Sequence, residues 1–210
     1  MSDLPEQSAT LLETARLRLC RLTPADVDHL VELDADPEVM RYLTNGRPTP
    51  LPVIRDELLP HLLDQYDRWP GLGRWAATDR LDGAFLGWFA LAPPAGDLPA
   101  SGPTQAELGY RLRRSAWGRG LATEGARALV RYAFTRLGLR RVWAETMAVN
   151  VGSRRVMQKA GLHYVRTFHL TWDDPIPGYE HGEVEYEIRS PDARKDALPT
   201  ESTTGAFIPW

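Results

Sequence analysis

The sequence predicts an α+β fold in which one sheet is covered by helices on both faces. Segments with the alternating apolar and polar pattern of strands occur along the whole chain, and segments with helical spacing lie between them. The 210 residues are 43% hydrophobic, enough for one sizeable core. Helices that connect strands of one sheet pack on its faces. We therefore expect a single domain over residues 11–190, with polar tails at 1–10 and 191–210.

The first quarter of the chain is predicted to form a strand, a helix and a loop. Residues Arg16–Arg21 alternate as a strand does. Thr23–Asp26 begins a helix, because Thr is a good cap, Pro suits the first helical position and an acid follows. Residues 34–50 are predicted as a loop, since Asp36-Pro37 and Asn45-Gly46 are turn signals.

A helix and a hairpin are expected next. Val53–Trp69 has helical spacing, but Pro60 should kink or split this helix because proline lacks an N–H group. Two strands are predicted at Arg74–Thr78 and Ala84–Leu91. The residues between them, Arg80–Gly83, are typical of a hairpin turn.

The second half of the chain alternates strands and helices after a loop rich in proline and glycine at Pro93–Pro103. Asn150 is a good N-cap and Gly161 a good C-terminal residue for the shorter of the two helices. The predicted elements, in order, are a strand at Glu107–Leu112, a helix at Ala126–Leu137, a strand at Arg141–Thr146, a helix at Val151–Ala160, and strands at Thr167–Trp172 and Glu183–Ile188.

The run Trp117–Glu124 is the most informative part of the sequence. It contains Gly118 and Gly120 and joins a predicted strand to a predicted helix. Glycines allow a tight turn whose N–H groups point at one spot, and the helix adds its unpaired N-terminal donors and dipole. Such a turn binds phosphate. A P-loop and a dinucleotide fingerprint fit badly, because the run has no Lys and position 123 is Thr.

The same run, with the residues that follow, resembles the GNAT superfamily of acyl-CoA-dependent N-acetyltransferases. The branch that it resembles includes the ribosomal-protein N-terminal acetyltransferases. The phosphate loop of that family, Gln/Arg-x-x-Gly-x-Gly/Ala, is matched by Trp117–Ala122, with Trp as a departure. Its Asn-x-x-Ser is matched by Asn150 and Ser153, and its Glu-Lys-x-Gly-Phe by Gln158–Leu162. The resemblance covers residues 11–190 and implies a GNAT-like mixed, mostly antiparallel central sheet.

The resemblance also implies a binding site for acetyl-CoA. The pyrophosphate is expected on the amides after Gly118, and the pantetheine arm along the backbone of the central strand. Asn150 is expected to bond the pantetheine amide or to act as a plain helix N-cap, and both roles are compatible. The implied cofactor-binding residues are Tyr110, Arg111, Leu112, Trp117, Gly118, Arg119, Gly120, Leu121, Ala122, Thr123, Asn150 and Ser153.

Acetyl transfer from a thioester to an amine by direct attack needs a neutral amine and a proton for the leaving thiolate. Glu107 is predicted as the general base, acting through a water; the alternative is a solvated strand residue. Ser153 is the family position near the thiolate, and its alternative is a hydroxyl that satisfies backbone donors. Tyr164 is a second candidate acid, although an aromatic residue there more often belongs to the core.

The composition of the chain limits the classes of partner and ligand that are expected. The net charge of −3 gives no reason to expect nucleic-acid or membrane binding, and no apolar stretch is long enough to cross a bilayer. Cys20 is the only cysteine, and the first residues do not resemble a signal peptide, so a cytoplasmic protein is expected. The histidines are scattered, so no metal site is predicted. The resemblance is also compatible with a homodimer.

Three functions are consistent with these residues. The first is an N-acetyltransferase for a primary amine, either a protein N-terminus or a small molecule. The second is a non-catalytic acyl-CoA-binding module. The third is a transferase for a longer acyl group, which a wider pocket near Leu108, Tyr110 and Trp143 would permit.

Overall fold

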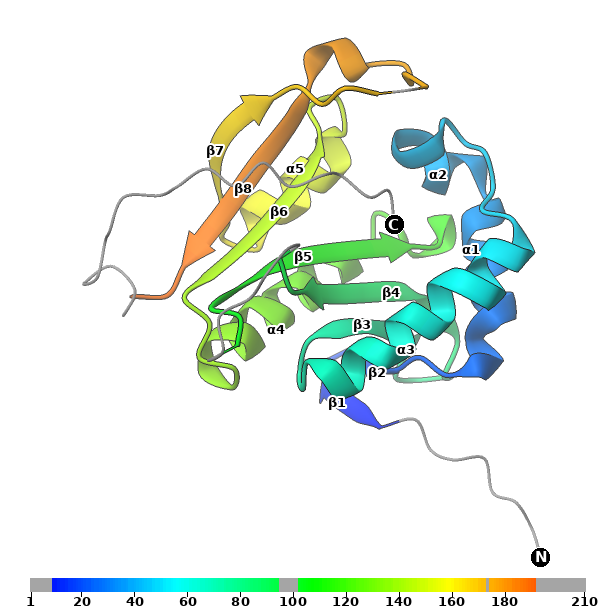
Figure 1. Cartoon of the computed structure of the whole chain (residues 1–210). Helices are drawn as coiled ribbons and strands as arrows, with labels where there is room; N and C mark the ends of the chain where they lie inside the picture. The colour runs from blue at the N-terminus through cyan, green and yellow to red at the C-terminus, as the bar shows by residue number, and fades with distance from the viewer. Residues whose placement is uncertain (1–8, 95–101, 173, 192–210) are drawn as a thin grey trace, which may run out of the picture.

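The computed structural model describes residues 9–94, 102–172 and 174–191. Its centre is one eight-stranded sheet with the strand order β1-β2-β3-β4-β5-β6-β8-β7 (Figure 1). The strands are β1 Thr10–Glu13, β2 Leu17–Arg21, β3 Gly73–Asp79, β4 Phe85–Ala92, β5 Gln105–Leu112, β6 Arg141–Met147, β7 His163–Phe168 and β8 Glu183–Arg189. The predicted mixed, mostly antiparallel sheet is therefore confirmed.

The pair β5–β6 is the parallel pair of this sheet, and the other neighbouring strands run antiparallel. Only three residues of each strand are paired across it, ending at Glu107 opposite Trp143. Beyond this point β5 stays paired with β4, and β6 stays paired with β8. The two strands therefore diverge, as Figure 1 shows, and we call the place where they part the fork.

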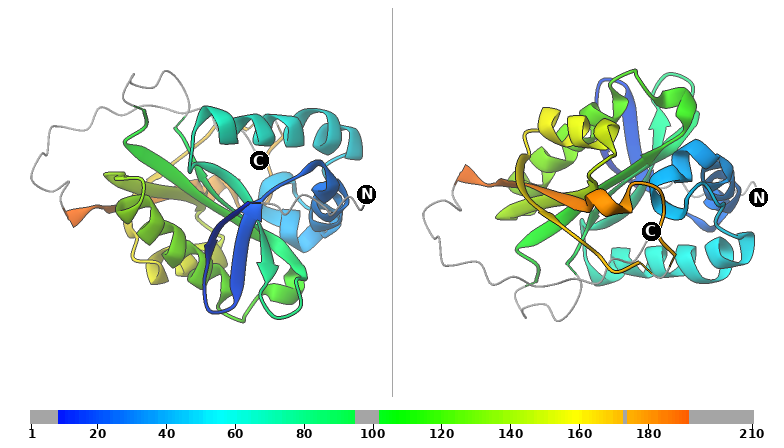
Figure 2. Two further views of the ribbon diagram at one scale, coloured as in Figure 1. Left: turned by 90° about the horizontal axis from the view of Figure 1, so that it is seen from below. Right: turned by 90° about the horizontal axis from the view of Figure 1, so that it is seen from above.

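Helices lie on both faces of the sheet, as predicted. One face carries α1 Val27–Ala35 and α3 Leu59–Arg68, and the opposite face carries α4 Leu121–Thr135 and α5 Val151–Lys159 (Figure 2). Alternation along the strands supplies both faces with apolar side chains. On β4, for example, Trp88 packs with the helices of the first face and Phe89 packs with those of the second. The sheet is thus buried on both sides, and its central strand β4 is almost wholly apolar.

The predicted loop at 34–50 is wrong, because it contains the helix α2 Pro37–Thr44. The side chain of Asp36 accepts a hydrogen bond from the Glu38 amide, and Pro37 occupies the first turn. Asn45 ends the helix in the left-handed conformation, with φ of 55°. The residues interpreted as turn signals are therefore the two caps of a short helix, a role that the same residue types serve equally well.

The helix predicted at Val53–Trp69 begins instead with the π-helical segment η2 Val53–Leu58, followed by α3. Pro60 lies in the first turn of α3, directly after the π-helical residues. Because proline cannot donate to the preceding turn, the irregular hydrogen bonding falls at this place.

Two further elements have boundaries several residues away from the prediction, and one strand was missed. The seventh strand was expected at Thr167–Trp172, but β7 occupies His163–Phe168. It is an edge strand with nearly all residues exposed, so no burial pattern marks its limits. Strand β1 was missed because it is a four-residue edge strand. Helix α4 begins at Leu121, directly after Gly120, rather than at Ala126.

Much of both predicted tails and of the proline-rich loop, namely residues 1–8, 192–210 and 95–101, lies outside the described residues. Within the described ranges, no helix is long and apolar enough to cross a membrane.

Candidate active site

The glycine run forms a tight turn that leads into α4. Gly118 and Gly120 have φ of 71° and 77°, values that residues with a Cβ rarely adopt. A Cβ on Gly118 would meet no atom within 4 Å, and on Gly120 only the Arg16 Nη2 atom at 3.7 Å. Backbone conformation, rather than lack of space, therefore requires glycine here. The N–H groups of the first turn of α4 have no intrahelical partners and are available to a ligand.

This turn borders a cavity of about 770 Å³ that extends along the fork. The cavity is lined by β5 on one side, by the end of β6 and the start of α5 on the other, and by α2. Its volume lies within the range of about 300–1,000 Å³ that is typical of ligand sites. The cavity is where the predicted residues meet. Those that line it are Glu107, Tyr110, Arg111, Leu112, Trp117, Gly118, Gly120, Leu121, Ala122, Thr123, Asn150 and Ser153.

Three of the residues considered from the sequence are not among those that line the cavity. The Arg119 side chain forms an ion pair with Asp79 at 3.7 Å. Trp143 lies beside the end of the β5–β6 pairing. Tyr164 was expected in the core, which is wrong: it is 53% exposed on the edge strand β7, where it packs against Tyr186.

A hydrogen-bond chain joins the two walls of the cavity. The Tyr110 hydroxyl lies 2.9 Å from Ser153 Oγ, and it donates to the Ser153 carbonyl oxygen at 3.1 Å. Asn150 Oδ1 accepts from the Ser153 amide at 3.1 Å, and its Nδ2 donates to Thr146 Oγ1. Asn150 is thus the N-cap of α5, as predicted. Burial raises the pKa of Tyr110, so its phenol stays protonated. The sequence interpretation used only the backbone of Tyr110 and missed this hydroxyl.

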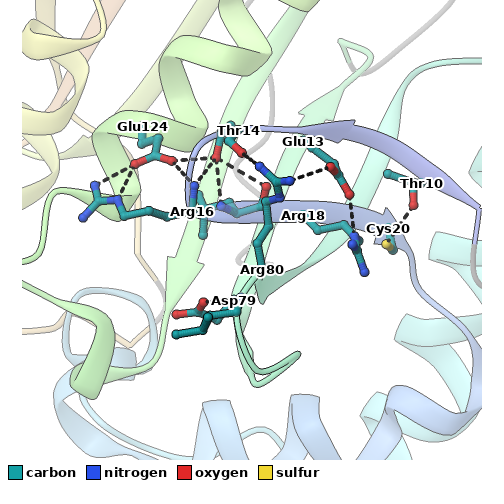
Figure 3. A network of polar contacts seen from close by, with 11 residues as sticks. Thr10, Glu13, Thr14, Arg16, Arg18, Cys20, Asp79, Arg80 and Glu124 are labelled. Atoms are coloured by element: carbon teal, nitrogen blue, oxygen red, sulfur yellow. Dashed lines mark hydrogen bonds and ion pairs between the residues drawn. The ribbon is translucent and has the colours of Figure 1, made fainter.

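The glycine turn is held by the N-terminal hairpin through Glu124 on α4 (Figure 3). Glu124 Oε1 accepts from the Thr14 hydroxyl at 2.6 Å and from the Arg16 amide at 2.9 Å. Its Oε2 accepts from Arg16 Nε at 2.7 Å. Arg16 Nη1 also donates to the Arg119 carbonyl oxygen at 2.9 Å, inside the turn. These contacts fix the first turn of α4 relative to the hairpin β1–β2.

The Trp117 indole adds a second support for the turn. Although it is 46% exposed, its Nε1 donates to the Leu112 carbonyl oxygen at 2.8 Å. The indole therefore ties the start of the turn to the end of β5. A polar residue at this position, as in the family pattern, would lack the aromatic body that covers this end of the strand.

Glu107 lies at the fork, on the last pair between β5 and β6. The pKa of Glu107 is raised to about 7, mainly by burial and then by the nearby Glu145 carboxylate, while the Arg74 guanidinium opposes the shift. A carboxylate with a pKa near neutrality is matched to accepting a proton at physiological pH. The position of Glu107 at the fork and its raised pKa are therefore compatible with the role of a general base.

Two further glutamates at the fork were missed. Glu145 on β6 and Glu183 at the start of β8 line the same cavity, and the pKa of each is raised to about 7. Burial is the larger cause of both shifts. The second cause is the charge of Glu185 for the pKa of Glu145, and the charge of Glu145 for the pKa of Glu183. The alternation in Glu183–Arg189 could have placed Glu183 on one face with the other glutamates of β8, because a strand has period two, but it carries no signal for Glu145.

A buried ion pair supports the wall of the cavity next to Glu107. Arg111 on β5 pairs with Asp34 on α1, and both side chains are only 5% exposed. Asp34 also accepts a hydrogen bond from the Thr49 hydroxyl at 2.6 Å. Arg74 lies near this pair with its guanidinium 3.9 Å from the ring centre of Trp88. Helix α1 and the segment after α2 are thereby fixed to the central strands.

These observations fit an elongated ligand with a phosphate group at one end. The positive-φ turn and the N-terminus of α4 form the phosphate cradle, and the long cavity continues from it to Glu107 at the fork. The donors of the cradle are backbone amides, which do not require a metal. Within the described ranges, no group of three or more metal-ligating side chains occurs.

Comparison with known families gives one match that covers most of the chain. The family model described as an acetyltransferase (GNAT) domain matches residues 16–163. The matched region contains the glycine turn, Glu107, Asn150 and Ser153.

Similar proteins and solved structures agree with this family match. The chain is 40% identical to the FsC-acetyl coenzyme A-N(2)-transacetylase of Aspergillus fumigatus, over 95% of this chain and 86% of that protein. It is 33% identical to the YkkB protein of Bacillus subtilis, over 81% of this chain and 95% of that protein. A structure of the RimL ribosomal-protein acetyltransferase in complex with coenzyme A has the same fold, with a TM-score of 0.69 and 16% identity over 86% of this chain and 98% of that one.

Proposed function

This chain belongs to the GNAT acetyltransferase family, and we propose that it moves the acetyl group of acetyl-CoA to a primary amine by direct attack. The observation that carries the proposal is the continuity of one cavity from the glycine turn to Glu107. A phosphate cradle at one end and a carboxylate with a pKa near neutrality at the other are the two groups that this reaction requires.

The cradle holds the pyrophosphate of the cofactor on the amides of Arg119, Gly120, Leu121, Ala122 and Thr123. Acetyl-CoA supplies a thioester carbonyl carbon, which an amine can attack without a covalent enzyme intermediate. The backbone of Tyr110, Arg111 and Leu112 borders the cavity where β5 has left β6, so it offers strand-like hydrogen bonds to an extended arm. The Asn150 amide borders the same stretch of the cavity.

Glu107 removes a proton from the incoming ammonium, because only a neutral amine has a lone pair for attack. Its pKa of about 7 makes the ionised carboxylate the main form just above neutral pH. Arg74 moderates the shift by favouring the ionised form. A water between the carboxylate and the amine completes the path, as in general-base catalysis through one water.

Ser153 and Tyr110 form the donor pair for the leaving sulfur. Their hydroxyls are 2.9 Å apart, so a proton given by one can be replaced from the other. Because burial keeps the Tyr110 phenol protonated, the pair retains a donor over the whole neutral range. The proposal assigns the proton on the leaving sulfur to Ser153 and its replacement to Tyr110, which regains a proton through solvent as Glu107 releases the one it took from the amine.

The acceptor is proposed to be a primary amine, either on a small molecule or at a protein N-terminus. The first class is favoured by the name of the A. fumigatus relative, which specifies transfer to an N(2) position. The second stays in the proposal because a ribosomal-protein acetyltransferase shares the fold; its identity of 16% carries no argument about the acceptor. We further expect a homodimer, which size-exclusion chromatography tests, and a cytoplasmic protein, which cell fractionation tests.

The proposal is tested by two measurements on the full chain. The first is the melting temperature with and without acetyl-CoA, since a ligand that binds the folded state raises it. The second is free-thiol release over a panel of amines and short peptides. Stabilisation with thiol release is expected. Stabilisation without release from any amine would favour the acyl-CoA-binding module instead, and release from longer acyl-CoA alone would favour the third function.

Gly120→Val separates cofactor binding from folding. Valine at φ of 77° is strained, so the turn should lose its shape and its affinity for acetyl-CoA. Gly83→Val is a matched control, because Gly83 also has φ of 77° and lies in the hairpin turn before β4. Unchanged acetyl-CoA affinity in Gly120→Val would overturn the assignment of the cradle.

A further inference from the structure

Three glutamates lie together at the fork, on one face of the sheet. Glu107 is on β5, Glu145 on β6 and Glu183 on β8, and all three line the cavity. Glu107 lies opposite Trp143 of β6. Glu145 follows Trp143 by two residues, so the side chains of Trp143 and Glu145 lie on the same face of the sheet. Glu183 is opposite Met147, again two residues from Glu145. Glu145 is therefore the middle member, a diagonal neighbour of Glu183 at about 7–8 Å.

The sheet neutralises its other glutamates on this face. Glu185 forms ion pairs with Arg141 and, at 2.6 Å, with Arg166. Glu187 forms ion pairs with Arg141 and, at 2.7 Å, with Arg189. Direct pairing of Glu145 with Glu185 across β6 and β8 is thus tolerated because two arginines flank Glu185. The arginines near this face therefore pair with Glu185 and Glu187, which do not line the cavity, and not with Glu145 or Glu183, which do.

Among the residues that the structure describes, Glu183 forms no ion pair of this kind. Its residue is only 1% exposed, and its Oε1 atom lacks a hydrogen-bond partner among the described residues. Its neighbours across the sheet are Met147 on β6 and Phe168 on β7, both apolar. A buried carboxylate with an unpaired oxygen is costly for folding, and such groups are concentrated at functional sites.

The positive groups near the three glutamates do not balance them. Arg74 lies close to Glu107, but Asp34 and Arg111 compensate each other beside it. Arg166 and Arg141 act on Glu145 from the far side, where they are bound to Glu185. Arg41 on α2 lines the cavity and pairs with Glu38 at 3.8 Å. Arg155 and Lys159 also line the cavity, from exposed positions on α5 rather than from the strands that carry the three glutamates. The cavity end at the fork therefore keeps an excess of negative charge.

We propose that Glu145 and Glu183 form a second cation subsite beside Glu107, so that the acceptor is an amine that carries another positive group a short distance from the reacting nitrogen. The inference rests on the proposed function, because Glu107 is taken as the base for the reacting amine. One ammonium satisfies Glu107. The second positive group satisfies the buried Oε1 of Glu183 and the middle carboxylate of Glu145. Diamines, and peptides with a basic residue close to the N-terminus, share this chemistry.

The test is a binding measurement that needs no turnover. Isothermal titration calorimetry of the full chain, saturated with CoA at about pH 8, compares a linear five-carbon diamine with the matching monoamine. The diamine is expected to bind at least about tenfold more tightly, which is the effect of one additional charge-assisted hydrogen bond. Glu183→Gln and Glu145→Gln should each reduce this preference severalfold. Glu57→Gln removes the same charge from an exposed residue of η2 and should leave it unchanged.

Equal affinities of the wild-type chain for diamine and monoamine would overturn the inference, as would a preference that survives in both glutamine variants. Failure of CoA to bind would instead overturn the proposed function, so the two failures are distinguishable. A second comparison uses peptides that differ only in whether Lys or Ala follows the N-terminal residue. A preference for lysine that Glu183→Gln removes would assign the subsite to peptides, and a preference confined to the diamine would assign it to small molecules.

Discussion

Replacement of Glu183 by glutamine should make the protein more stable above neutral pH. Glu183 is 1% exposed, and burial followed by the charge of Glu145 raises its pKa from 4.5 to about 7. In the unfolded chain the carboxyl ionises freely, so ionisation favours unfolding between these two pH values. The glutamine variant carries no titrating proton at this position. The difference in stability between the two proteins should therefore change with pH.

The size of the effect follows from linkage. A pKa difference of roughly 2.5 units corresponds to about 3 kcal/mol in the free energy of unfolding. The raised pKa means that the wild-type chain has its full stability below about pH 4.5 and loses this amount as the pH rises through about 7. Between pH 5 and pH 8, the advantage of Glu183→Gln should grow by about 2–3 kcal/mol. In a chain of this length that is a melting-temperature difference of roughly 5–10 °C.

Urea denaturation of both proteins at pH 5 and pH 8 measures this difference. Comparison of the variant with the wild-type chain cancels the carboxylates that do not interact with Glu183, such as Glu124, whose pKa is lowered by hydrogen bonds from Thr14 and Arg16 that outweigh its burial. Glu57→Gln, at an exposed position, should show no such change. A stability difference that is the same at both pH values would refute the reasoning, because it would mean that Glu183 ionises as easily in the folded state as in the unfolded chain.

Three further predictions follow from the site and its supports. Glu107→Gln should reduce turnover by about 10²–10⁴-fold and leave acetyl-CoA affinity near wild type; steady-state kinetics should also show the wild-type rate rising through about pH 7, and equal rates for the two proteins would exclude Glu107 as the base. Gly125→Ala should lower the free energy of unfolding by about 1–3 kcal/mol, because the new Cβ would lie 2.3 Å from Phe89 Cζ. An unchanged melting temperature would contradict this prediction, because it would mean that α4 can move away from Phe89 without loss of stability. Glu124→Gln should raise the KM for acetyl-CoA severalfold with little change in kcat, since it breaks the ion pair with Arg16 that supports the glycine turn; a lower kcat with the same KM would contradict a role in positioning.

The parts of the site that the sequence predicts are those encoded locally. The glycine turn is one continuous run, and its conformation depends on two residues that tolerate positive φ. Asn150 caps α5 through Ser153, three residues away, so the cap could be recognised without the fold. Helix α2 was missed for a related reason. Asp36 and Asn45 cap it, and those residue types mark turns as readily as helix ends.

The glutamate subsite could not be predicted in the same way. Glu107, Glu145 and Glu183 come together only because β5 pairs with β6 and β6 pairs with β8. The alternation in Glu183–Arg189 shows which side chains share a face, but not which strand is next to it. The hydroxyl pair of Tyr110 and Ser153 likewise bridges two elements, and its residues are 43 positions apart. Strand adjacency is a tertiary property that spacing along the chain does not contain.

The support of the glycine turn by the N-terminal hairpin has a consequence for how the chain folds. The contact between Arg16 and Glu124 joins residues 108 positions apart, so closing it requires a large loss of chain entropy. Contacts of this range slow folding, because the intervening segments have to be nearly in place before the contact forms. During synthesis the hairpin leaves the ribosome long before α4 does. Pulse-labelling hydrogen exchange should therefore find the Arg16 amide, which donates to Glu124 Oε1 at 2.9 Å, among the last to gain protection, after the amides of β3 and β4.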